Sequence, residues 1–141
     1  MAFLFDTDAI SELLRSVPLP AYVEWLERVP RDEQFTSSVV VGELYRGAYR
    51  SRASERHLEG IEKRILPAVT VLPYDVATAS VYGKLHAQLS DAGQALADAD
   101  LQIAATALYH DLELVTGNLR HFGRIDELRI SNSLVRARQQ S

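Results

Sequence analysis

The stretch Ala2-Phe3-Leu4-Phe5-Asp6-Thr7-Asp8 opens the chain with an apolar run that stops at a carboxylate. The run Ala2–Phe5 predicts a short buried strand. After Asp6, apolar residues recur at helical spacing, which predicts a helix containing Ile10, Leu13 and Leu14. The first strand is therefore expected to lead directly into a helix, with Asp6 at the junction.

The same alternation of strand and helix continues to the end of the chain. Apolar spacing and capping residues predict helices near residues 20–26, 37–48, 54–66, 75–89 and 99–110. Short strands are predicted at residues 69–72, 113–116 and 128–130, whereas residues 34–37 are too short to assign alone. Such alternation favours parallel pairing through right-handed crossovers, and therefore an open α/β sheet with helices on both faces.

Length and composition predict one domain that spans residues 1–141. The chain is 47% apolar and contains no repeat, linker or low-complexity tract. The absence of cysteine excludes disulfide frameworks, thiolate zinc sites and cysteine nucleophiles, and it agrees with a reducing compartment. No signal peptide or membrane span is visible, so we expect a cytoplasmic protein.

The net charge of −4 argues against sequence-independent coating of nucleic acid, which depends on surplus lysine and arginine. Any contact with nucleic acid is expected to be local or assisted by a metal ion. Arginines at positions 46, 50, 52 and 56 form a basic helix edge, which is most often solvated surface. Contact of this edge with phosphate or a partner is the minority interpretation.

The candidate chemistry is carried by polar residues near predicted strand ends and helix starts. In an open α/β sheet, ligands bind beyond the carboxyl ends of the strands. The candidate site residues are Asp6, Glu43, Asp98, Asp100 and Asn118. The fold can bring these residues together even though the sequence separates them.

Each candidate also has a purely structural interpretation. Asp6 could simply cap the first helix, and Asp8 is expected to interact with the helix dipole rather than to bind a ligand. Glu43 lies in an apolar stretch, where an unpaired carboxylate is costly. Asp98 and Asp100 together exceed what capping needs, with Asp98 expected to precede the helix as its cap. The four histidines lack ligand spacing and are interpreted as surface or packing residues: His57, His86, His110 and His121.

Converging carboxylates need a cation between them, because otherwise mutual repulsion would force one to take up a proton. Oxygen ligands of this kind suit Mg²⁺ or Mn²⁺, with water and a phosphate oxygen completing the coordination. The expected ligands are Asp6, Glu43 and Asp100, and the expected chemistry is phosphodiester hydrolysis.

At these residues the sequence resembles the PIN-domain ribonuclease toxins of the VapC type. The resemblance rests on three segments, whose order and spacing cover essentially the whole chain: residues 5–11 (FDTDAIS), 41–48 (VGELYRGA) and 98–107 (DADLQIAATA) continuing to 114–122 (LVTGNLRHF). It implies a three-layer α/β/α PIN-like fold with a central, mostly parallel sheet. It also implies Mg²⁺-dependent cleavage of single-stranded RNA, with Mn²⁺ able to substitute, together with homodimers and a cognate antitoxin.

By position, Asp6, Glu43 and Asp100 match the acids of this family, and Asp98 is an additional candidate. The family often has a fourth Asp where this chain has Asn118. Asn offers one neutral oxygen instead of an anion, which puts a tight second metal site in doubt.

Two alternatives compete with the ribonuclease hypothesis. The motif Phe5-Asp6-Thr7-Asp8 also resembles haloacid-dehalogenase-type phosphatases, in which Asp6 would be the nucleophile and Asp8 a general acid. A convincing lysine for that chemistry is missing, because only Lys63 and Lys84 exist. The other alternative is a non-catalytic α/β interaction module whose acids are caps and surface charges.

Overall fold

A computed structural model describes all 141 residues and places five strands in one parallel sheet. The order β3-β2-β1-β4-β5 comprises β1 (Phe3–Phe5), β2 (Gln34–Ser37), β3 (Thr70–Leu72), β4 (Glu113–Val115) and β5 (Ile130–Ser131). Every neighbouring pair is parallel, and the register places Leu4 beside Phe35 on one side and beside Leu114 on the other. The predicted parallel α/β sheet is confirmed.

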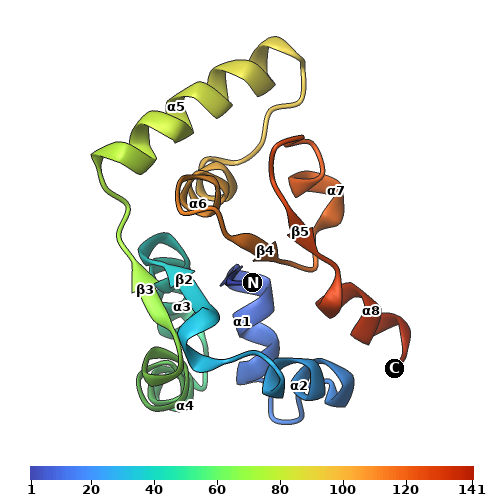
Figure 1. Cartoon of the computed structure of the whole chain (residues 1–141). Coiled ribbons are helices and arrows are strands. Elements are labelled where there is room, and N and C mark those ends of the chain that lie inside the picture. Colours follow the sequence, from blue (N-terminus) through green and yellow to red (C-terminus); the bar gives the residue numbers. More distant parts are fainter.

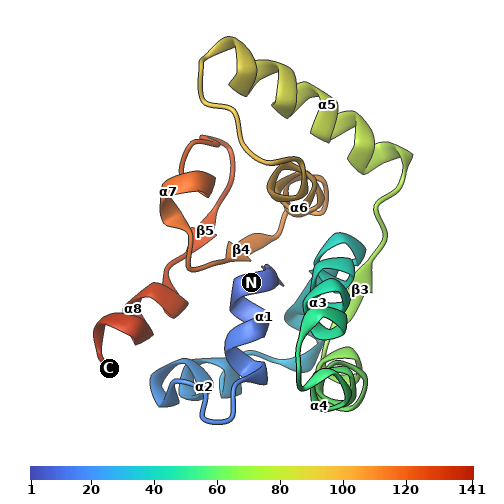
Figure 2. The same ribbon diagram turned by 180° about the vertical axis from the view of Figure 1, so that it is seen from behind.

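Helices cover both faces of this sheet. They are α1 (Thr7–Leu14), α2 (Pro20–Glu27), α3 (Ser38–Arg50), α4 (Ser54–Gly60), α5 (Val76–Asp91), α6 (Asp98–Tyr109), α7 (Leu119–Phe122) and α8 (Ser133–Gln139). Helices α1, α2 and α4 lie on one side, and α6 and α7 on the other, with α5 on the outside of α6 (Figures 1 and 2). Helix α3 contacts both α1 and α6. None of the helices is both long and apolar enough to span a bilayer.

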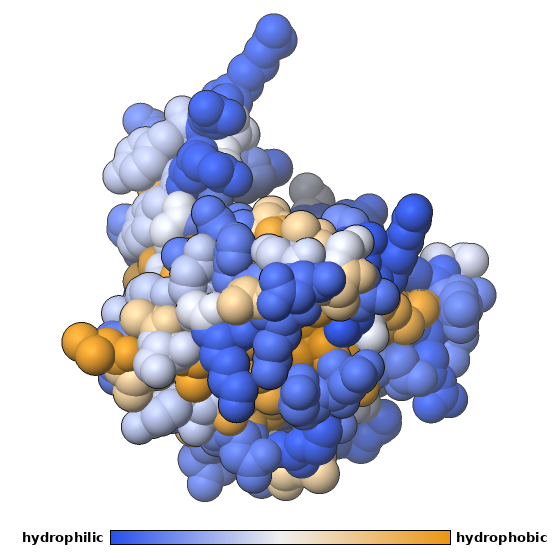
Figure 3. All heavy atoms as spheres, turned by 90° about the horizontal axis from the view of Figure 1, so that it is seen from above, coloured by the Kyte–Doolittle hydropathy of each residue, from blue (hydrophilic) through white to orange (hydrophobic).

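Helix α5 packs on α6 through one side only. Leu85 and Leu89 are buried in that contact, whereas most other side chains of the helix are exposed. Figure 3 views the molecule from above relative to Figure 1. The surface on this side is mostly hydrophilic, with smaller apolar areas between the polar ones.

Several sequence predictions need correction. The predicted helix 54–66 is α4 followed by a wider turn over Ile61–Ile65 and a 3₁₀ turn over Leu66–Ala68. The last strand begins later than predicted, and α7 and α8 carried too little apolar periodicity to be predicted. The prediction that Asp98 precedes and caps its helix was wrong, because α6 begins at Asp98 and its N-cap is Ala97.

The core is centred on the two middle strands. Leu4, Phe5, Leu114 and Val115 are at most 1% exposed, so polar side chains can follow these strands only beyond their carboxyl ends. The chain leaves β1 toward β2 on one side, while β4 flanks β1 on the other. The carboxyl ends of β1 and β4 therefore form the reversal of strand order at which α/β sheets bind ligands.

Candidate active site

Asp6 follows β1 directly and is only 4% exposed. Its backbone amide donates to the Val115 carbonyl at 3.1 Å, and its Oδ1 accepts from the Ala9 amide at 2.8 Å, which caps α1. The pKa of Asp6 is raised to about 7, mainly by burial and to a smaller extent by the charges of Asp8 and Asp100, although hydrogen bonds from Thr116 and Ala9 oppose the shift. Asp6 is thus a helix cap and also a buried, readily protonated carboxyl group.

Glu43 lies in the middle of α3 and is 24% exposed. The hydroxyl of Thr7 donates to its Oε1 at 2.5 Å, which connects α3 to the first residue of α1. Arg46, one turn further along the helix, approaches Oε2 only to 4.0 Å. Glu43 is therefore oriented mainly by Thr7.

Asp100 lies in the first turn of α6 with 28% of its side chain exposed. Loss of hydration raises its pKa, and the nearby charge of Glu43 raises it as well, whereas His121 lowers it. Nδ1 of His121 lies 3.8 Å from Oδ2 of Asp100. Asp100 and Glu43 both line the site, so the negative charge of Glu43 adds to the burial that raises the pKa of Asp100.

Asn118 follows β4 and caps the short helix α7. Its Oδ1 accepts from the backbone amide of His121 at 3.3 Å, and its Nδ2 lies 2.8 Å from Nδ1 of the same histidine. With Oδ1 engaged in the cap, Nδ2 is the amide atom that faces the imidazole ring. The oxygen of Asn118 is therefore already engaged.

These side chains line one hollow of about 360 Å³ at the carboxyl edge of the sheet. Its lining, which we call the acidic hollow, comprises Asp6, Thr7, Asp8, Ser11, Glu43, Asp100, Ile103, Asn118 and Phe122. Four of the five candidate residues are thus brought together from four separate segments.

Asp98 is the candidate that the structure places elsewhere. Its side chain is 69% exposed, accepts from the Tyr82 hydroxyl at 2.8 Å and lies 4.0 Å from Nε2 of His86. It is absent from the lining of the acidic hollow. Asp98 therefore faces α5 rather than the other acids.

Sequence reasoning missed the residues that hold the acids in position. Thr7 donates a hydrogen bond to Glu43, Nδ1 of His121 lies 3.8 Å from Asp100, and Thr116 lowers the pKa of Asp6. The only sequence signal for His121 was its place three residues after Asn118, within one helical turn. Thr7 and Thr116 gave none, because each lies far along the chain from the acid that it faces.

Asp8 lines the hollow but both its oxygens are occupied. Arg138 of α8 donates to Oδ2 at 3.0 Å and to Oδ1 at 2.8 Å. The phosphatase alternative required Asp8 to act as a general acid on a substrate, and a carboxylate whose two oxygens both accept from Arg138 is not free to contact one.

The donor set of the acidic hollow fits a hard cation. It consists of carboxylates and hydroxyls without sulfur, the ligand type of Mg²⁺ and Mn²⁺. No three acidic or histidine side chains converge closely enough to form a ready-made metal cage. Mg²⁺ commonly keeps several waters and is bound by one or two carboxylates, so a roomy hollow suits it.

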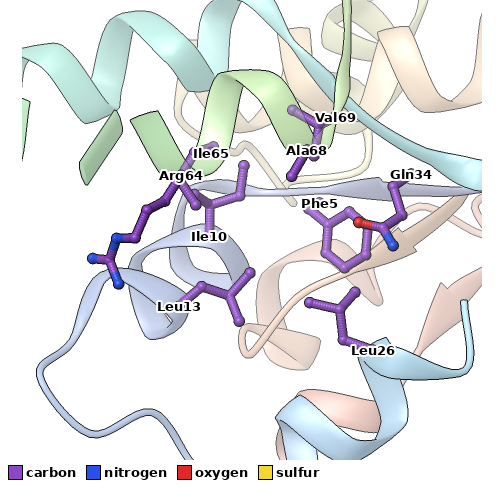
Figure 4. Close-up of a pocket in the computed structure, with 9 residues that line it drawn as sticks. All are labelled: Phe5, Ile10, Leu13, Leu26, Gln34, Arg64, Ile65, Ala68 and Val69. Atoms are coloured by element: carbon purple, nitrogen blue, oxygen red, sulfur yellow. The ribbon is translucent and has the colours of Figure 1, made fainter. Parts of the chain in front are cut away.

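A separate apolar cavity of about 210 Å³ lies between α1, α2 and the segment 64–69 (Figure 4). Seven of its nine lining residues are hydrophobic, and its polar members are Gln34 and Arg64. It offers no converging acids or bases, and therefore no comparable chemistry.

Comparisons with known proteins agree with this fold. The PIN domain model matches residues 3–128. Ribonuclease VapC2 of Haemophilus influenzae is 34% identical over 134 residues, covering 94% of this chain and 98% of the relative. The tRNA(fMet)-specific endonuclease VapC of Shigella flexneri is 33% identical, covering 92% and 96%. The crystal structure of DNA-bound VapBC from Salmonella typhimurium matches with a TM-score of 0.84 at 30% identity, over 93% of this chain and 97% of that one.

Proposed function

The chain belongs to the PIN-domain family of VapC-type ribonuclease toxins, and from this premise we propose that its acidic hollow is a Mg²⁺-dependent endoribonuclease site. In this proposal Asp6, Glu43 and Asp100 hold the metal ion, and Mn²⁺ can substitute for Mg²⁺. The observation that carries the proposal is that these three carboxylates line one hollow at the reversal of strand order.

Electrostatics supports a cation at this place. Dehydration and neighbouring negative charge raise the pKa values of both Asp6 and Asp100. A divalent ion would stabilise the ionised carboxylates that burial and mutual repulsion disfavour. When bound, such an ion polarises a phosphoryl oxygen and lowers the pKa of a coordinated water.

The chain's own residues orient and retain these ligands. Thr7 directs Oε1 of Glu43, while the Ala9 amide fixes the carboxylate of Asp6. Because the pKa of Asp6 is near neutrality, part of the metal-free population carries a proton on this group at pH 7. That proton must leave before Asp6 can bind a cation.

The proposed substrate is single-stranded or looped RNA. The relative from Shigella flexneri is named as a tRNA(fMet)-specific endonuclease, which supports a structured RNA with an exposed loop. We also propose a homodimer and a cognate antitoxin that silences the site. An antitoxin arginine suits the acidic hollow, because its planar fork can pair with two carboxylate oxygens.

The decisive experiment is RNA cleavage under metal control. Purified protein is incubated with single-stranded and stem-loop RNA in Mg²⁺, in Mn²⁺ and in excess chelator, with Asp6→Asn as the matched variant. We expect cleavage with either metal, none with chelator and none by Asp6→Asn. Cleavage that survives exhaustive chelation would contradict the metal-dependent mechanism.

A further inference from the structure

A hollow with basic walls lies at the C-terminal end of α1. It is lined by Leu14, Arg15, Ser16, Arg56, His57 and Arg64. An overlapping hollow shares most of these residues and adds Ser11 and Val17. Together they form one depression, which we call the arginine groove.

The arginine groove adjoins the acidic hollow. Ser11 lines both. Arg15 directly follows α1 and lies about one helical turn beyond Ser11, or about 6 Å at the usual helical rise of 1.5 Å per residue. A single extended strand of RNA can therefore cross the acidic hollow and continue into the arginine groove.

Two arginines of the groove have no carboxylate partner. Arg15 is paired with Glu12 at 3.1 Å, whereas the ion pairs of the structure include neither Arg56 nor Arg64. Unpaired guanidinium groups are suited to phosphate, which they can bind through two parallel hydrogen bonds. In a chain of net charge −4, such groups provide the local attraction that a polyanion needs.

The position of Arg64 is favoured by packing. A Cβ at Gly60 would lie 3.0 Å from Leu14 Cδ2 and 3.3 Å from Nη2 of Arg64. Glycine at this position therefore lets Arg64 lie close against α1. Figure 4 shows its guanidinium directed away from the apolar side chains of the neighbouring cavity, including Ile65 and Ile10.

We propose that the arginine groove binds a backbone phosphate of the RNA substrate, away from the bond that is cut, through Arg56 and Arg64. This inference rests on the proposed ribonuclease function and adds a substrate-holding surface outside the metal site. The groove supplies affinity for the strand, whereas the acidic hollow supplies the reaction.

The test measures binding of fluorescein-labelled oligouridylate by anisotropy, over a range of KCl concentrations with Mg²⁺ present. The parent is Asp6→Asn, which keeps the probe intact, and the test variant adds Arg56→Ala and Arg64→Ala. The matched control adds Arg28→Ala and Arg136→Ala. These two arginines also lack carboxylate partners, and they line a polar hollow that shares no residue with the acidic hollow.

We expect Kd for the probe to rise about tenfold in the test variant and to stay within about twofold of the parent in the control. The slope of log Kd against log salt should become shallower by about 0.7, because loss of the two arginines leaves one phosphate charge no longer neutralised. Arg56→Lys with Arg64→Lys should recover most of the slope, because the charge is retained. In protein with Asp6 intact, the alanine pair should raise KM and leave kcat unchanged.

Unchanged Kd and slope in the test variant would overturn the proposal. The proposal would also be overturned if the alanine pair weakened binding of oligoglutamate but not of oligouridylate. That result would assign the arginine groove to an acidic protein segment. Failure of the groove proposal can be distinguished from failure of the proposed ribonuclease function. If the wild type cuts RNA while the alanine pair binds normally, only the groove fails. If the wild type does not cut but the pair still weakens binding, only the proposed ribonuclease activity fails.

Discussion

The guanidinium of Arg138 holds the carboxylate of Asp8 through two hydrogen bonds, of 3.0 and 2.8 Å, and so ties the last helix to the first turn of α1. Gly117 lies directly against this pair. A Cβ at that position would come within 2.2 Å of Nη1 of Arg138 and of Oδ2 of Asp8. The ion pair therefore supports the loop that carries Thr116 and Asn118 to the acidic hollow.

Replacing Arg138 with Gln should destabilise the protein modestly. Both partners are about 40% exposed, so the pair contributes on the order of 1 kcal/mol rather than the larger value of a buried pair. Its loss also leaves the charge of Asp8 unneutralised beside Asp6. Urea unfolding at neutral pH should show the loss, and adding Asp8→Asn should restore part of it. Strictly additive effects of the two changes would mean that the pair does not contribute to stability.

Gly117→Ala should be costly only while the ion pair is present. The backbone of Gly117 does not have a positive φ, so the cost arises from the clash with Arg138 and Asp8 rather than from conformation. We expect Gly117→Ala to cost about 1 kcal/mol more in the wild type than in an Arg138→Ala background. A double-mutant cycle by urea unfolding measures this difference. An equal cost in both backgrounds would place the strain elsewhere.

The sequence predicted much of the fold because its signals are local. Apolar runs and cap residues predicted the central strands, and Asp6 and Asn118 stood out because each follows one of these strands. The residues that orient the acids could not be predicted, because their contacts join distant positions. Arg138 contacts Asp8 across 130 residues and Thr7 contacts Glu43 across 36. No periodicity encodes such pairs.

The wrong prediction that Asp98 precedes and caps its helix has a different cause. Either acid at the start of α6 satisfies the local preference of a helix start for negative charge. The choice between Asp98 and Asp100 depends on the rotation of the helix against its neighbours. Tyr82 of α5, 16 residues earlier, accounts for the position of Asp98, and that contact is tertiary.

Asp6→Asn should stabilise the metal-free protein at neutral pH. Folding raises the pKa of Asp6 from 3.8 to about 7, so the folded state binds this proton more tightly than the unfolded state. The contribution of Asp6 to stability is therefore fully present below pH 3.8 and is lost as the pH rises to 7. The asparagine variant avoids a cost of up to about 4 kcal/mol above pH 7.

Thermal unfolding in chelator at pH 4 and pH 8 measures this effect. The two proteins should melt at similar temperatures at pH 4, and the variant should melt higher at pH 8. Asn keeps an oxygen that can cap α1, so the cap itself is preserved. A variant that melts lower at pH 8 would show that ionised Asp6 stabilises the metal-free fold.

Thr7→Val should impair the site without unfolding it. Valine is close in shape to threonine but cannot donate to Oε1 of Glu43. Loss of a hydrogen bond to a charged group should lower kcat/KM for RNA by about tenfold, whereas Thr7→Ser, which retains the hydroxyl, should stay near the wild type. Titration with Mg²⁺ should show weaker binding by the valine variant. Equal activity of the valine and serine variants would mean that Thr7 does not orient Glu43.

Asp100→Ala and Asp98→Ala should differ sharply although the residues are two positions apart. Asp100 lies in the acidic hollow, so its removal should lower kcat/KM by about a hundredfold or more, beyond the usual loss for residues that only support a metal ligand. Asp98 is exposed and outside that hollow, so its removal should change kcat/KM by less than about twofold.

Stability measurements keep this comparison interpretable. Folding raises the pKa of Asp100, so its ionised form opposes folding at neutral pH, and Asp100→Ala should not lower the melting temperature in chelator. Tyr82→Phe serves as the control for Asp98, because it removes the same hydrogen bond from the other side. If Asp98→Ala abolished activity at an unchanged melting temperature while Tyr82→Phe did not, Asp98 would contact the substrate or metal itself. The ligand assignment would then move from Asp100 to Asp98, and α6 would have to turn relative to α5 for the reaction to occur.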